Sequence, residues 1–146
     1  MREHPDLWRM LSEAGLEVLG FASAGELPSP TQVWSAFASS QPETVFSDPD
    51  DEQFTRYGDL RDAWLGAARK SGVIDANQEF LISVEGSGGG VPWSHVKLTD
   101  RLSVEQLGAY PGHPSFVAID RTGTQMCGID TEEHGFWIIV GPARRH

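Results

Sequence analysis

The sequence of 146 residues has little of three things: cysteine, basic side chains and long apolar runs. Cys127 is its only cysteine, which excludes an intrachain disulfide and a zinc site built from several thiolates. No stretch reaches the roughly 18 apolar residues that a membrane-spanning helix needs. Charged side chains such as Arg2 and Asp6 interrupt residues 1–11, which therefore lack the apolar core of a signal peptide. We expect a cytoplasmic protein that contacts no membrane.

Basic side chains are outnumbered, because 11 Lys and Arg stand against 21 Asp and Glu, for a formal net charge of −10. A surface of that sign repels phosphate backbones and anionic lipid headgroups. Direct binding of nucleic acid needs clustered basic residues and is therefore not expected. The same charge keeps a protein soluble, and it also attracts a basic protein partner over a long range. Both interpretations of the acidity stay open on composition alone.

The first half of the chain predicts helices. Apolar residues at three- and four-residue intervals predict helices over residues 5–14 and 31–38. Between them, Glu17–Ala22 is apolar and partly β-branched, which indicates a strand. The clearest helix is predicted from about Pro49 to Ser71, with Gly72 as its C-terminal stop.

The second half of the chain predicts strands. Phe80–Val84 and Val91–Leu98 are separated by a glycine-rich connection, and Ser103 with Gln106 predicts a capping box at the start of a short helix. Three apolar segments separated by turns then predict an antiparallel meander: Phe116–Asp120, Thr124–Asp130 and Phe136–Val140.

The segment Phe136–Val140 is apolar throughout, which is typical of a strand covered on both faces or hidden in a subunit interface. Residues 141–146 are expected to form a short loose tail. Helices early and strands late predict the α+β class. We predict one α+β domain over residues 1–146, in which N-terminal helices pack on a C-terminal antiparallel sheet that ends in the three-stranded meander.

The one candidate for nucleophilic chemistry is Cys127, which is followed by Asp130 and His134. A histidine can activate a thiol, but the turn that holds His134 lies on the order of 10 Å along the strand from Cys127, and a hydrogen bond needs about 3 Å. Cys127 is therefore either a small core residue or the centre of a thiol-dependent enzyme or ligand-binding domain whose histidine comes from a distant strand.

Motifs for metals and nucleotides are absent from the sequence. The histidines show no paired ligand spacing, and the acidic run at residues 48–52 lacks the glycine and the distal glutamate of a calcium loop. The glycine run at residues 86–90 continues into a predicted strand, whereas a phosphate-binding loop continues into a helix. We expect no metal, no cofactor and no enzymatic activity.

Carboxylates concentrate in two segments of the chain. Asp48 to Glu52 surround the predicted start of the long helix, where acids also stabilise the helix dipole. Asp59 and Asp62 continue along one side of that helix, away from its apolar stripe. The candidate partner-binding residues are Asp50, Asp51, Glu52, Asp59 and Asp62, with Glu132 and Glu133 as a second patch. The alternative is that both patches are only solvated surface.

A small acidic α+β chain without a catalytic motif resembles the bacterial immunity proteins of polymorphic toxin systems. Its segments from Phe116 through Cys127 to Val140 are similar in style to strand–turn–strand segments in several of them. The resemblance implies tight binding to a cognate toxin, often a basic nuclease, with acidic residues that mimic the phosphate substrate. The alternatives are the thiol-dependent domain centred on Cys127 and a homo-oligomer with Phe136–Val140 at its interface.

Overall fold

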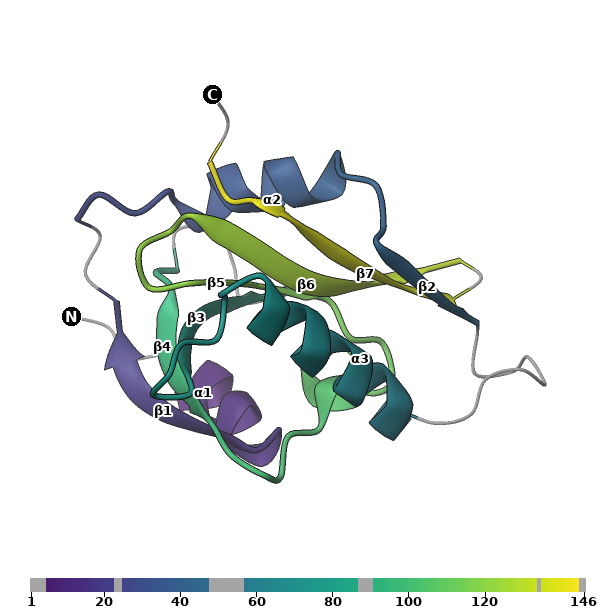
Figure 1. The fold of residues 1–146 in the computed structure, drawn as a ribbon. Coiled ribbons are helices and arrows are strands. Elements are labelled where there is room, and N and C mark those ends of the chain that lie inside the picture. Colours follow the sequence, from purple (N-terminus) through teal and green to yellow (C-terminus); the bar gives the residue numbers. More distant parts are fainter. Residues whose placement is uncertain (1–4, 23–24, 48–56, 87–90, 134, 145–146) are drawn as a thin grey trace.

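The computed structural model describes residues 5–22, 25–47, 57–86, 91–133 and 135–144. Within these ranges the chain forms three α-helices, a short 3-10 helix and a seven-stranded antiparallel sheet (Figure 1). The helices are α1 (Pro5–Glu13), α2 (Pro30–Ala38), α3 (Tyr57–Lys70) and the 3-10 helix η1 (Val104–Gln106). The strands are β1 (Leu16–Phe21), β2 (Thr44–Ser47), β3 (Glu79–Val84), β4 (Ser94–Leu98), β5 (Phe116–Ile119), β6 (Gln125–Glu132) and β7 (Gly135–Pro142). The α+β class and the C-terminal meander are confirmed.

The strand order is β1-β4-β3-β5-β6-β7-β2, so the meander β5–β6–β7 lies inside the sheet. Both edge strands come from the N-terminal half of the chain, which makes the sheet wider than the C-terminal one predicted. The edge strand β2 was not predicted at all. It pairs with β7 from Thr44 opposite Ile138 to Ser47 opposite Gly135.

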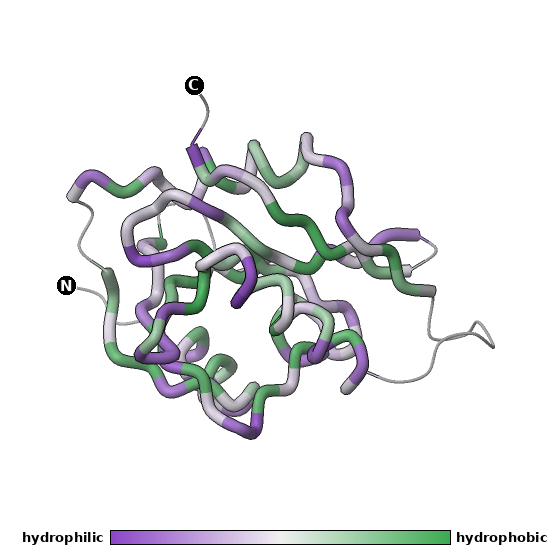
Figure 2. The backbone as a smooth tube through the Cα atoms, in the orientation of Figure 1, coloured by the Kyte–Doolittle hydropathy of each residue, from purple (hydrophilic) through white to green (hydrophobic). Residues whose placement is uncertain are grey.

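Side chains alternate between the two faces of the sheet and therefore fill two separate cores. Helices α1, α3 and η1 cover one face, where the buried Trp64 meets the rings of Phe80 and Phe116 at centroid distances of 5.7 and 5.2 Å. Helix α2 covers the other face, where Phe37 packs in the core that contains Val117. Figure 1 shows α2 on one side of the sheet and α1 with α3 on the other, and Figure 2 shows apolar segments along the central strands.

Strand β7 contributes side chains to both cores, which fits the first of the two alternatives for its apolar sequence. Phe136 and Ile138 belong to the core beneath α3, and Ile139 belongs to the core beneath α2. None of the helices in the described ranges is both long enough and apolar enough to cross a membrane.

Two local predictions are wrong. The Ser103 side chain makes no capping hydrogen bond, and the helix after it is a single 3-10 turn. Two residues after this turn, a Cβ at Gly108 would lie 2.3 Å from the carbonyl oxygen of His113, so only glycine fits where these two segments meet. The expected loose tail is ordered as far as Arg144, because β7 runs to Pro142 and the Ala143 amide donates to the Thr124 carbonyl at 2.9 Å.

Candidate protein-binding surface

Helix α2 crosses one face of the sheet and leaves a part of that face on each side of the helix. At one side of the helix, Trp34 Nε1 donates to Ser83 Oγ on β3 at 2.9 Å. At the other, Phe37 lies so close to Gly128 on β6 that a Cβ there would come within 2.7 Å of the ring. The register places Ser83 and Gly128 both opposite Val117, so α2 crosses the sheet along this row. On one side of it, the neighbouring row of Leu81, Ile119 and Met126 is buried and apolar, whereas the row on the other side carries acidic and exposed side chains.

The row toward the β6–β7 turn combines acidic and apolar side chains from three adjacent strands. Val45 on β2 pairs with Trp137 on β7, which pairs in turn with Asp130 on β6. Glu132 follows two residues after Asp130 and therefore lies on the same face. We call Val45, Trp137, Asp130 and Glu132 the acidic row. Val45 is 63% exposed and Trp137 is half-buried against the α2 core.

The two carboxylates of the acidic row are held close together. Ser115 Oγ donates to Asp130 Oδ1 at 3.2 Å, which positions that carboxylate. A side-chain hydrogen bond to Asp130 raises the pKa of Glu132, and partial burial and the negative charge of Asp130 raise the pKa of Glu132 further. Holding both groups ionised costs free energy, and a cation between them would remove that cost.

A hollow of about 450 Å³ adjoins the acidic row, because it is lined by Ser115, which donates to Asp130. Its other described lining residues are Glu85, Tyr110, Pro111, His113 and Thr131. Tyr110 is 69% exposed, and tyrosines of this kind are frequent anchors of protein interfaces. Three large hydrophobic side chains are exposed in the described ranges, and Val45 and Tyr110 are two of them.

The structure separates the sequence-predicted acids onto two faces. Asp59 is half-buried and Asp62 is exposed on α3, where Arg61 Nε donates to the Asp62 carboxylate at 3.0 Å. Tyr57 at the start of α3 packs on Phe136 with a ring-centroid distance of 5.8 Å, so this helix lies beneath the face opposite to the acidic row.

The second predicted patch is only partly on the acidic row. Glu132 belongs to it, whereas Glu133 is exposed in the β6–β7 turn. The remaining candidates, Asp50, Asp51 and Glu52, lie outside the described residues.

Cys127 is fully buried on the face of β6 that is covered by α3. Burial, with a smaller contribution from the charge of Glu43, raises the pKa of its thiol far above the ordinary value. Asp130 lies on the opposite face of the same strand, and His134 lies outside the described residues. A thiol that stays protonated and inaccessible is a poor nucleophile, so the geometry supports a core role for Cys127.

Sequence reasoning missed the apolar members of the site. Trp137 stands in an apolar segment and gives no sign in the sequence that its face is partly open. Val45 belongs to a strand that was not predicted, and Tyr110 precedes Pro111 and Gly112, a pattern that indicates only a turn. The alternation of side chains along β7 would have placed Trp137 and Asp130 on one face, had the register been known.

Comparison with known protein families, curated proteins and solved structures finds no match to this chain.

Proposed function

We propose that this protein is a non-enzymatic binding domain that docks a basic protein on the acidic row. The observation that carries the proposal is the pair of adjacent carboxylates, Asp130 and Glu132, beside the half-buried Trp137. An Arg or Lys side chain placed there would form charge-assisted hydrogen bonds and relieve the repulsion between the two acids.

The surroundings of the carboxylates fit a protein partner better than a small cation. Aromatic side chains supply much of the binding energy in protein interfaces, and charged pairs at their rim set specificity and association rate. Trp137 and the exposed Tyr110 and Val45 supply apolar contact area around the acids. The net charge of −10 would accelerate the approach of a basic partner.

Among basic partners, we favour a toxin domain, which makes the protein an immunity protein of a polymorphic toxin system. This follows from the class resemblance in size, acidity and the strand–turn–strand style of the C-terminal half. In that role, the carboxylates of the acidic row would occupy a phosphate-binding active site and block it.

Photo-crosslinking from defined positions tests the proposal. p-Benzoylphenylalanine is placed at Val45 or at Tyr110 in the full chain, and captured proteins from the source cell are identified by mass spectrometry. The matched control carries the probe at Ala76, which is exposed beside the Asp75–Arg121 ion pair at the other end of the sheet. We expect one basic protein to be captured from Val45 and Tyr110 and not from Ala76.

A second set of experiments tests whether Glu132 contacts the partner and whether binding inhibits the partner. Glu132→Lys and raised salt should both reduce the capture, and the wild-type protein should inhibit the enzymatic activity of the captured partner in vitro. Capture that is equal from all three positions, or unaffected by Glu132→Lys, would overturn the acidic row as the docking site. A captured partner whose activity is unchanged would overturn the immunity role and leave the docking surface intact.

A further inference from the structure

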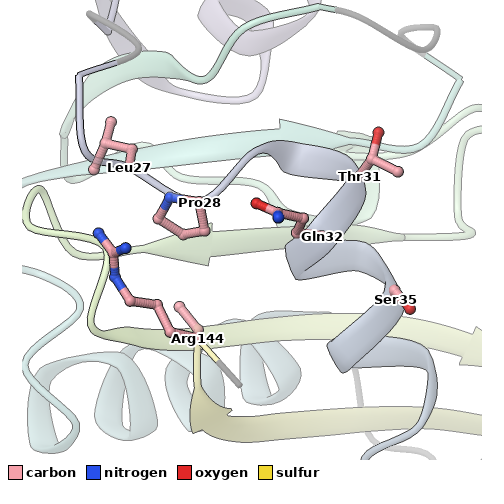
Figure 3. A pocket seen from close by; sticks show the side chains of 7 residues that line it. Leu27, Pro28, Thr31, Gln32, Ser35 and Arg144 are labelled. Atoms are coloured by element: carbon pink, nitrogen blue, oxygen red, sulfur yellow. The ribbon is translucent and has the colours of Figure 1, made fainter. Parts of the chain in front are cut away.

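The other end of the α2 face holds a cavity of about 550 Å³ between the first turns of α2 and the segment that follows β7. The described lining residues are Leu27, Pro28, Thr31, Gln32, Ser35, Ala143 and Arg144 (Figure 3). Small-molecule sites typically measure about 300–1,000 Å³ and combine apolar walls with a few polar groups. Among these residues Arg144 alone is charged, and it is a cation in a protein of net charge −10.

The guanidinium of Arg144 is held in place without being neutralised. Its Nε donates to the Gly123 carbonyl at 3.2 Å, and its Nη2 donates to the Glu26 carbonyl. Both acceptors are uncharged backbone groups. Within the described ranges no ion pair involves Arg144, so its charge and its remaining N–H donors stay available to a ligand.

The walls of the cavity are fixed by contacts from three sides. The Pro28 carbonyl accepts a buried hydrogen bond of 2.8 Å from Trp93 Nε1. Gly123 has a φ of +74° and lets this segment approach so closely that a Cβ would lie 2.6 Å from Pro28 Cδ. Ser29 and Gln32 form a reciprocal capping box that sets the first turn of α2. A preformed site loses little free energy to ordering when a ligand binds.

The neighbouring cavity restricts the charge of the ligand. It measures about 650 Å³ and shares Leu27 and Arg144 with the first. Its second arginine, Arg121, is already paired with Asp75 at 2.7 Å and lies 3.7 Å from the Glu79 carboxylate. Glu26 also lines this second cavity, and its negative charge would repel a polyanion, whereas the Arg144 guanidinium suits a single negative charge.

We propose that the cavity at Arg144 binds a small organic acid with one carboxylate and a short apolar body. The carboxylate pairs with the Arg144 guanidinium, which presents planar donors of the geometry that carboxylates prefer. The apolar body lies against Leu27 and Pro28. In Figure 3 the Gln32 carboxamide extends toward Pro28, and its NH₂ group donates to the polar end of the ligand.

The test uses 3-phenylpropionate as the probe and its neutral amide as the matched compound. Binding to the full chain is followed by the amide NMR shifts of Leu27, Thr31 and Ala143. We expect saturable binding of the acid with a Kd of about 1 mM or tighter, and binding of the amide that is weaker by about tenfold or more. Arg144→Gln should weaken binding of the acid by a similar factor. Arg101→Gln, at an exposed position elsewhere, should leave the affinity for the acid unchanged.

A second pair of variants tests the location of the binding site without changing Arg144. Ser35→Phe fills the cavity from an exposed position of α2 and should abolish binding, whereas Ala38→Phe on the same helix should not. Equal binding of acid and amide, an unchanged affinity in Arg144→Gln, or no saturable binding of the acid would each overturn the proposal. Inorganic phosphate that displaces the acid from the same site would overturn the assignment to monocarboxylates.

Discussion

Glu132 links charge to stability at the scale of a single residue. Its pKa is raised above the ordinary value of 4.5 in the folded protein, first by the hydrogen bond to Asp130. The folded state therefore binds this proton more tightly than the unfolded chain does, and the difference lowers stability as the pH rises from 4.5 through the folded pKa. Below this window the carboxyl is protonated in both states and the penalty is absent.

Glu132→Gln should consequently raise the free energy of unfolding at pH 7, by a few tenths of a kcal/mol for a partly exposed group. The gain should disappear at about pH 3, where Glu132 is protonated anyway. Urea unfolding at both pH values measures it. Glu13→Gln, at an exposed position of α1, controls for the change of net charge. An identical gain at the two pH values would show that the effect does not come from the ionised pair.

At the scale of elements, the starts of α2 and η1 form a natural comparison. Ser29 Oγ accepts from the Gln32 amide at 3.2 Å and the Gln32 side chain accepts from the Ser29 amide at 2.9 Å, whereas Ser103 has no such bond. Ser29→Ala should therefore destabilise the protein by about 1 kcal/mol, and Ser103→Ala by clearly less. Urea unfolding of both variants under one condition decides this, and equal losses would contradict the assignment of the cap.

Elements that depend on a local sequence pattern were predicted, whereas elements that depend on long-range pairing were not. The helical ranges 5–14 and 31–38 were predicted within about two residues because their apolar spacing is a local pattern. The four-residue strand β2 was missed because its pairing partner, β7, is distant in sequence. The same pairing brings Val45 beside Trp137 in the acidic row, so the sequence did not reveal that these two side chains are neighbours. Arg144 was not predicted as a site residue either, because residues 141–146 were expected to form a loose tail.

At the scale of the whole molecule, the surplus of acids allows two docking surfaces, which binding kinetics can distinguish. The sequence predicts contact along α3, and the arrangement of the sheet favours the acidic row on the opposite face. Long-range attraction depends on net charge and affects both alike, but it is screened beyond about 10 Å at 0.1 M salt. Contacts that persist in the complex instead change the dissociation rate.

The deciding measurement compares two double variants that each remove two negative charges, using the partner identified by crosslinking. Asp130→Asn with Glu132→Gln should slow association slightly and speed dissociation by about tenfold or more, because contacts in the bound state are lost. Asp59→Asn with Asp62→Asn should produce only the slower association, and that difference should shrink as salt is raised. The opposite result, with fast dissociation only in the α3 variant, would place the partner on the helix and leave the acidic row as solvated surface.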